Sequence, residues 1–212
     1  MTVVITGTSR GIGKGLADAY RARGEEVIAT TRDSTWAFDV CDTVSRAAFA
    51  EKIGNRPVDL LVCNAGVYLD RDASMGDGYE ADVWTMSFAV NVTGVYLTVE
   101  TLMDNLRAAD AGRIAIISSR MGSSKRALGG SYIYRASKAA ALNLGRNLSR
   151  DLAVEGIAVG IYHPGWVRTD MGGPRADIST YESVTGLMAR FDALDLDNTG
   201  SFLNWDGREI PY

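Results

Sequence analysis

Histidine, cysteine and proline are scarce in this sequence. Its 212 residues include one histidine (His163), two cysteines (Cys41 and Cys63) and four prolines. A single histidine excludes most zinc sites built on imidazole ligands, and it leaves a Ser-His-Asp triad only if His163 serves it. The cysteines lie too far apart for a metal knuckle or a redox pair, so we expect no metal site and two reduced thiols, as in the cytoplasm.

Long hydrophobic runs and an excess of positive charge are also missing. No stretch approaches the roughly 18 apolar residues that span a bilayer, and the first residues lack the basic and long apolar regions of a signal peptide. The formal net charge of −4 argues against nucleic acid and anionic membranes as main partners. With 46% hydrophobic and 23% charged residues, we expect a soluble chain that folds as one domain over residues 1–212.

Short apolar segments alternate with longer helical patterns along the whole chain. Nearly continuous apolar runs are typical of parallel strands covered on both faces, and they predict strands over 2–6, 26–30, 58–63, 113–118, 157–162 and 200–204. Helices are predicted over 11–23, 42–54, 79–107, 133–155 and about 180–194. This alternation predicts an α/β fold with a parallel sheet.

A glycine-rich turn, TGTSRGIG over residues 6–13, joins the first predicted strand to the first predicted helix. Glycines permit a tight turn and a close approach of the backbone to a ligand, and the start of a helix offers free N–H groups and a positive dipole to a phosphate. Gly7, Gly11 and Gly13 have the spacing G-x-x-x-G-x-G. This turn predicts a nucleotide site, with a helix cap that has spare glycines as the alternative.

Two tyrosines and a lysine occur in the segment SYIYRASKAA, residues 131–140. In a helix, residues four apart share a face, so Tyr134 and Lys138 are neighbours whereas Tyr132 points elsewhere. An ammonium beside a phenol favours the phenolate and lowers the tyrosine pKa. The pair therefore predicts an acid or base that works near neutral pH. From this segment alone, a surface Tyr–Lys pair on an alanine-rich helix is the alternative.

Five motifs in order resemble those of the short-chain dehydrogenase/reductase family. They are T-G-x-x-x-G-I-G at 6–13, N-A-G at 64–66, I-S-S at 117–119, Y-x-x-x-K at 134–138, and P-G followed by T at 164–169. The segment around Tyr134 and the ending GSFLNWDGREIPY are similar to small C-factor-like and carbonyl-reductase-like members. The resemblance implies a doubly wound, Rossmann-like parallel sheet, an NAD or NADP cofactor, and a homodimer or homotetramer.

The resemblance also implies a role for each matched residue. Tyr134 is the acid/base, and Lys138 lowers its pKa and holds the nicotinamide ribose. Ser119 positions the substrate oxygen, and Asn91 orders a water of the proton relay. The expected cofactor contacts are Gly7, Ser9, Arg10, Gly11, Ile12, Gly13, Arg32, Asp39, Val40, Asn64, Ala65, Gly66, Tyr134, Lys138, Pro164, Gly165, Val167 and Thr169.

Some of these assignments keep an alternative. Ser118 competes with Ser119, which we prefer because adjacent strand residues point to opposite sides of a sheet. Asn91 could instead bridge backbone groups between a helix and a strand. We expect His163 to be packed rather than catalytic, because Tyr134 already fills the proton-transfer role. The interval between Ser119 and Tyr134 is slightly longer than is usual in the family, which predicts an insertion in the loop between them.

The chain departs from the family pattern after its second predicted strand. Only TRDSTW separates EVIAT from AFDV, where the family has a crossover helix, and parallel neighbours need a connection of about a dozen residues or more. We therefore predict that the helix between strands 2 and 3 is missing and that strand 3 is lost or a stub. In the family resemblance Asp39 matches the residue that contacts the adenine, and the short connection weakens that assignment.

The end of the second predicted strand bears on the choice of dinucleotide. NAD-selective proteins place an acidic residue there to hold the ribose 2′-hydroxyl, whereas this chain has Thr31 followed by Arg32. Arg10 in the glycine turn adds a second cation, and a guanidinium grips a phosphate through two charge-assisted hydrogen bonds. The sequence therefore favours NADP over NAD, although Asp33 is a carboxylate that could repel the phosphate.

These features predict an NADP-dependent oxidoreductase that transfers hydride between the cofactor and a small carbonyl or alcohol substrate. A dinucleotide-binding regulatory or signalling protein on the same fold is the alternative.

Residues 195–206 have the acidic spacing of a calcium loop, but they lack the helix that should follow it and fit the last strand better. Five residues are expected either near an apolar substrate or in lid and core packing: Met121, Leu128, Trp166, Met171 and Met188.

Overall fold

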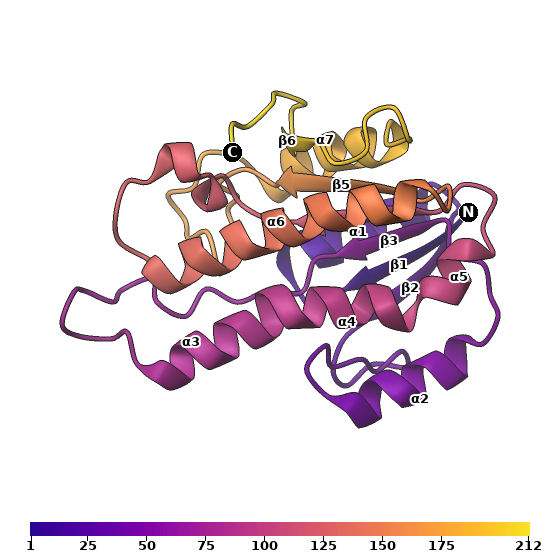
Figure 1. Ribbon diagram of the computed structural model, residues 1–212, viewed down its shortest axis with the longest axis horizontal. Helices are drawn as coiled ribbons and strands as arrows, with labels where there is room; N and C mark the ends of the chain where they lie inside the picture. Colours follow the sequence, from indigo (N-terminus) through magenta and orange to yellow (C-terminus); the bar gives the residue numbers. More distant parts are fainter.

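The computed structural model describes residues 1–212 and contains one six-stranded parallel sheet with helices on both faces (Figure 1). The strand order is β2-β1-β3-β4-β5-β6. The predicted α/β fold with a doubly wound parallel sheet is therefore confirmed. The strands are β1 (Thr2–Thr6), β2 (Glu26–Thr30), β3 (Leu60–Cys63), β4 (Arg113–Ile117), β5 (Ala158–His163) and β6 (Phe202–Asn204).

The helices divide between the two faces of the sheet. On one face α1 and α7 pack through a cluster that includes Leu16, Tyr20 and Leu187, and on the other α2, α4 and α6 pack through a second cluster. None of the helices is long and apolar enough to cross a membrane. Their bounds are α1 (Gly11–Ala22), α2 (Thr43–Ile53), α3 (Ala81–Phe88), α4 (Gly94–Thr101), α5 (Met103–Arg107), α6 (Tyr132–Ala153) and α7 (Thr180–Asp192).

The helix predicted over 79–107 is not continuous. A π-helical turn, η1 (Ala89–Thr93), separates α3 from α4, and Leu102, with φ −108° and ψ 10°, separates α4 from α5. A π turn holds one more residue than an α turn, and such turns are frequent at functional sites. Here the turn contains Asn91, whose side chain is completely buried against the loop after β3 and against α6.

The connection between β2 and α2 contains turns and one isolated parallel bridge, between Thr31 and Ala37. No helix lies between Thr30 and Thr43. The segment is anchored to α2 by aromatic packing, because Trp36 and Phe38 lie with ring centroids 6.0 and 4.7 Å from that of Phe49.

The order in which strands are added to the sheet reverses between β1 and β3, although all the strands are parallel. From β1 the chain passes outward to β2 and then returns to β3 on the other side of β1. In open α/β sheets, ligands bind in the crevice outside the carboxyl ends of the strands at this switch point. The turns that begin at Thr6 and Cys63 are therefore where a site is expected.

Candidate active site

The glycine turn after β1 and the N-A-G turn after β3 are locked together. The amide nitrogen of Asn64 donates to the carbonyl oxygens of Thr6 and Gly7, both at 2.9 Å. Gly7 has φ +71°, and a Cβ built on it would lie 2.8 Å from the Cα of Ala65. Only glycine allows both this backbone conformation and this close approach. The two turns are therefore hydrogen-bonded and closely packed against each other at the switch point.

The rest of the glycine turn forms the start of α1. Arg10 is its N-cap, in an extended conformation, and no side chain caps the first turn, an arrangement that leaves helix N–H groups for a phosphate. A Cβ on Gly13 would collide with the carbonyl oxygen of Gly7. Ser9 is exposed, whereas Ile12 packs against the core cluster on the α1 face.

The loop after β5 lies against the glycine turn from the other side. The hydroxyl of Ser183 in α7 donates to the carbonyl oxygen of Pro164 at 2.6 Å, and Val167 forms an isolated bridge with Ile178. The methyl group of Thr169 lies 3.4 Å from the place that a Cβ on Gly11 would occupy. Gly165 has φ +91°, so the turn that starts this loop favours glycine. The structure thus brings the predicted 164–169 contacts beside the predicted phosphate turn.

Ser119, Tyr134 and Lys138 form a buried group between the end of β4 and the start of α6. Their exposed fractions are 4%, 8% and 5%. The hydroxyl of Ser119 lies close enough to the Tyr134 phenol to lower its pKa and accepts from the backbone N–H of Met121 at 3.1 Å. The hydroxyl of Ser118 instead donates to the carbonyl oxygen of Lys138 at 2.9 Å. The two serines therefore point to different partners, and it is Ser119 that meets the phenol.

Burial shifts the pKa values of Tyr134 and Lys138. Burial raises the pKa of Tyr134 to about 12, outweighing the neighbouring Ser119 hydroxyl, which lowers it. The ammonium of Lys138 donates to the carbonyl oxygen of Ile117 at 3.0 Å and lies 5.7 Å from the centroid of the Tyr134 ring. Burial lowers the pKa of Lys138 itself to about 8. Desolvation therefore dominates the pKa of the phenol in this structure, and the role of Lys138 in lowering that pKa stays a prediction.

Asn91 and Lys138 meet at Gly66. The Oδ1 atom of Asn91 accepts from the backbone N–H of Val67 at 2.9 Å, and its amide nitrogen donates to the carbonyl oxygen of Val67 and to the hydroxyl of Ser137. A Cβ on Gly66 would lie 3.2 Å from that Oδ1 and 3.4 Å from the Nζ of Lys138. The Asn91 side chain makes the backbone bridge that was the alternative reading of this residue, and it joins the N-A-G turn to the helices.

The predicted residues between β2 and α2 are engaged locally. Arg32 is exposed and makes no ion pair, and Asp33 accepts from the hydroxyl of Thr31 at 3.0 Å. The carboxylate of Asp39 accepts from the backbone N–H of Cys41 at 2.9 Å. The side chain of Val40 is buried in the core.

Comparisons with known proteins agree with this arrangement. The family model described as short chain dehydrogenase matches residues 31–178, more than half of the chain. The chain belongs to the short-chain dehydrogenase family. The matched segment includes Asn91, Ser119, Tyr134 and Lys138.

Individual relatives extend the match to the whole chain. The C-signal of Myxococcus xanthus is 39% identical over 78% of this chain and 99% of that protein. An NADPH-bound carbonyl reductase from chicken fatty liver covers 100% of this chain and 98% of that chain, with 27% identity and a TM-score of 0.90. A Burkholderia multivorans short-chain dehydrogenase/reductase with bound NADP covers 100% and 99%, with 29% identity and a TM-score of 0.89.

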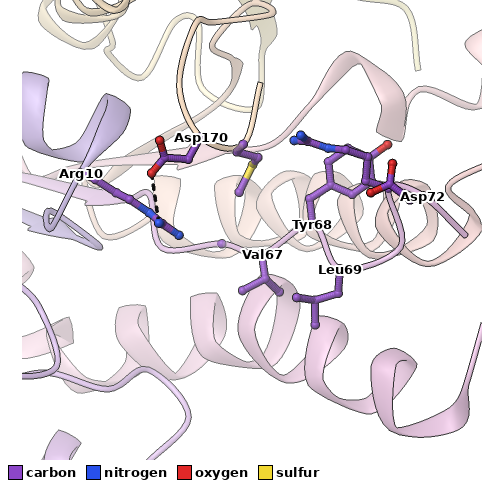
Figure 2. A pocket seen from close by; sticks show the side chains of 9 residues that line it. Arg10, Val67, Tyr68, Leu69, Asp72 and Asp170 are labelled. Atoms are coloured by element: carbon purple, nitrogen blue, oxygen red, sulfur yellow. Dashed lines mark hydrogen bonds and ion pairs between the residues drawn. The ribbon is translucent and has the colours of Figure 1, made fainter. Parts of the chain in front are cut away.

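A cleft of about 350 Å³ opens beside Gly66 in this short-chain dehydrogenase (Figure 2). Of the five residues predicted near the pocket, only Met171 lines it; Met188 packs against the core and Leu128 is 86% exposed. Charged and apolar side chains both form its wall, so those five residues give little support to an apolar substrate. The lining residues are Arg10, Gly66, Val67, Tyr68, Leu69, Arg71, Asp72, Asp170 and Met171.

Tyr68 also lines this cleft, and no sequence motif indicated it. Its ring stacks on that of Tyr134, with centroids 4.2 Å apart and an interplanar angle of 21°, and its hydroxyl hydrogen-bonds that of Ser131 at 2.6 Å. Tyr132, by contrast, is 39% exposed and packs near Tyr79. Tyr68 lies two residues after N-A-G in a segment without helical or strand periodicity, so no local pattern distinguishes it.

His163, at the end of β5, is buried and affects the stability of the fold at acid pH. It is 6% exposed and neither ring nitrogen has a partner. Burial, then Arg120 and Arg126, lower its pKa from 6.5 to about 3. A histidine that is buried neutral stabilises the fold above pH 6.5, and that stabilisation is lost as the pH falls from 6.5 toward 3.

We therefore expect His163→Leu to flatten the acid limb of the stability curve. As the pH falls below neutral, the free energy of unfolding of the wild type should decrease by up to about 1.4 kcal/mol per pH unit more than that of the variant. Urea unfolding of both proteins at a series of pH values measures this difference. Above neutral pH the difference should be constant, which is the internal control. Parallel curves throughout the acid range would contradict the prediction.

Proposed function

We propose that this chain is an NADP-dependent carbonyl reductase or alcohol dehydrogenase, with Tyr134 as the acid/base. The observation that carries the proposal is the buried group of Ser119, Tyr134 and Lys138, placed beside Gly66 and Tyr68 at the cleft. A hydroxyl, a phenol and an ammonium gathered in one water-poor site have the chemistry needed to bind a carbonyl oxygen and protonate it.

The residues present fit a dinucleotide. The uncapped start of α1 follows a turn in which Gly7 and Gly11 have φ values of +71° and +58°, so the backbone can approach a pyrophosphate closely. Gly66 keeps a side chain away from the space beside Lys138. We assign the glycine turn, the N-A-G turn and residues 164–169 to hold the cofactor, which supplies hydride in reduction and takes it up in oxidation.

In the reductive direction the hydroxyl of Ser119 donates to the carbonyl oxygen of the substrate. As negative charge develops on that oxygen, the phenol of Tyr134 gives it a proton and is left as a phenolate. Because burial raises the phenol pKa to about 12, the phenol is protonated at neutral pH and ready to act as the donor. The ammonium of Lys138, still mostly protonated at neutral pH with a pKa of about 8, then opposes the charge on the phenolate.

The preference for NADP is supported by two arginines and by relatives solved with NADPH or NADP. Arg32 is exposed and free of ion pairs at the end of β2, where a 2′-phosphate is expected. Arg10 pairs with Asp170 at 3.1 Å, as the dashed line in Figure 2 shows, and both side chains are more than 70% exposed. Such an exposed pair is weak, so a phosphate can displace Asp170.

We expect Arg10→Ala and Arg32→Ala each to weaken NADPH binding by about tenfold or more, because a hydrogen bond to a charged group contributes about 1.5–3 kcal/mol. NADH binding should change little. Asp170→Asn, which frees Arg10 without removing it, is the matched control and should bind NADPH at least as tightly as wild type. Dissociation constants for both cofactors measure this. A wild type that prefers NADH, or arginine variants that do not discriminate, would refute the NADP assignment.

The alternative is a dinucleotide-binding signalling protein on the same fold, and the relative named C-signal favours it. Oxidation of NADPH with a panel of aldehydes, ketones and quinones separates the two. Turnover that depends on Tyr134 supports the reductase. Tight NADPH binding with no turnover across the panel supports the alternative.

A further inference from the structure

The helix that carries Tyr134 and Lys138 is not capped by its own N-cap residue. α6 begins at Tyr132, and the N-cap, Ser131, has φ +46° and ψ 44° and makes no side-chain bond to the helix. Serine is a common N-cap, but in an extended conformation. In this left-handed conformation Ser131 leaves the first N–H groups of α6 without their usual local acceptor.

The missing acceptor comes from the loop after β3. The carboxylate of Asp70 accepts from the backbone N–H of Ile133 at 2.8 Å and from that of Tyr134 at 3.2 and 3.3 Å. Asp70 is 1% exposed and forms no ion pair. A buried carboxylate is costly unless it is fully hydrogen-bonded, and here the N–H groups and the positive end of the α6 dipole stabilise it.

The same loop also contacts the Tyr134 ring. Tyr68 stacks on that ring and bonds the Ser131 hydroxyl. The backbone and the ring of Tyr134 are thus both contacted from residues 68–70, more than 60 positions away in the chain.

We infer that Asp70 is a positioning residue, which fixes the first turn of α6 and thereby the place of the Tyr134 phenol against Ser119. This inference rests on the proposed function for its catalytic consequence. Its structural part, that Asp70 holds the start of α6, stands independently.

Asp70 also acts on the charge of the site. Its carboxylate opposes ionisation of Tyr134, as does Tyr68, whereas Arg71 favours it. The other groups against the phenol are Ser119, which also favours ionisation, and the ammonium of Lys138 at 5.7 Å from the ring centroid. Neutralising Asp70 should therefore move the alkaline titration of Tyr134 toward lower pH. Exposure of the phenol would move it in the same direction, so the variant that decides is Asp70→Asn, which removes the charge and keeps the shape of the side chain.

The test compares Asp70→Ala and Asp70→Asn with Asp77→Asn, an exposed carboxylate of the same loop that makes no side-chain bond. Amide hydrogen exchange of the full chain without ligand reports on the helix start. We expect exchange at Ile133 and Tyr134 to be roughly tenfold or more faster in Asp70→Ala than in the control. Asp70→Asn, which keeps one acceptor oxygen and the same shape, should be intermediate and guards against a failure of the alanine variant to fold.

Kinetics then test the catalytic consequence. We expect kcat for carbonyl reduction to fall roughly 10- to 100-fold in Asp70→Ala, because misplacing a catalytic group by about 1 Å has effects of that size. The NADPH dissociation constant should change much less than kcat. Asp70→Asn should recover part of kcat while shifting the alkaline limb of the pH profile to lower pH.

The two proposals fail in different ways. Unchanged exchange at Ile133 and Tyr134 in Asp70→Ala overturns the inference about Asp70 whatever the activity. Faster exchange with wild-type kcat and an unshifted pH profile overturns the positioning role. A wild type that reduces no carbonyl compound refutes the proposed function, while the exchange measurement still decides whether Asp70 holds α6.

Discussion

Tyr134→Phe is expected to bind NADPH with the wild-type dissociation constant, and its kcat is expected to be roughly 10²- to 10⁴-fold lower than that of the wild type. The substitution removes one oxygen and leaves the ring stacked on Tyr68. General acid catalysis contributes a factor of that size. Without the phenol, the developing alkoxide has the Ser119 hydroxyl but no positioned proton donor.

The matched control is Tyr132→Phe, the same change two residues earlier in α6 on a side chain that is 39% exposed. Steady-state reduction of the best substrate from the carbonyl panel and NADPH titration measure both variants. The pH profile of the wild type is a further check: reduction should be flat through the neutral range, because the raised pKa of Tyr134 keeps its phenol protonated there. Retention of most of the activity in Tyr134→Phe would contradict the mechanism.

The second large effect is expected for Gly122→Ala, which changes no chemical group of the site. A Cβ on Gly122 would lie 2.6 Å from the carbonyl carbon of Lys138 and 2.8 Å from the backbone nitrogen of Ala139. These are backbone atoms of α6, so the short helical turn η2 (Arg120–Gly122) must move away from α6. Overpacking of this kind costs about 1–3 kcal/mol.

The displacement should also lower activity, because the backbone carbonyl oxygen of Ser119 accepts from the backbone N–H of Gly122 at 2.8 Å. Ser119 would therefore move with η2. We expect kcat to fall by about 10²-fold together with the loss in unfolding free energy. Ser124→Ala, an exposed change in the same segment, serves as the control. Chemical denaturation and steady-state kinetics are the measurements, and wild-type values for both in Gly122→Ala would rule out the tight packing of η2 on α6.

Features that depend on local spacing were predictable from the sequence. Tyr134 and Lys138 stand four apart, so any helix places them together, and the continuous apolar runs predict parallel strands because such strands are covered on both faces. The small number of residues after β2 also showed in advance that the connection from β2 to α2 is short. The glycine turn and the N-A-G turn follow strands, so the topology brings them to one edge of the sheet.

Features that depend on the folded surroundings were not predictable. The phenol pKa of Tyr134 rises because the ring is buried, and burial is a property of the whole fold. The π turn at Asn91 is associated with bonds to Val67 and Ser137, which are distant in sequence. Ser131 has the residue type of an N-cap, so nothing local indicates that Asp70, over 60 positions earlier, caps α6 instead.

β2, which precedes the short connection, is an edge strand of the sheet. β2 has a single strand neighbour, β1, and the bridge between Thr31 and Ala37 is the only pairing beyond its end. Unpaired strand edges can recruit strands from other molecules and so promote aggregation. This edge is only five residues long and begins with Glu26, an exposed carboxylate paired with Arg56. A short, charged edge of this kind disfavours joining of two sheets through β2.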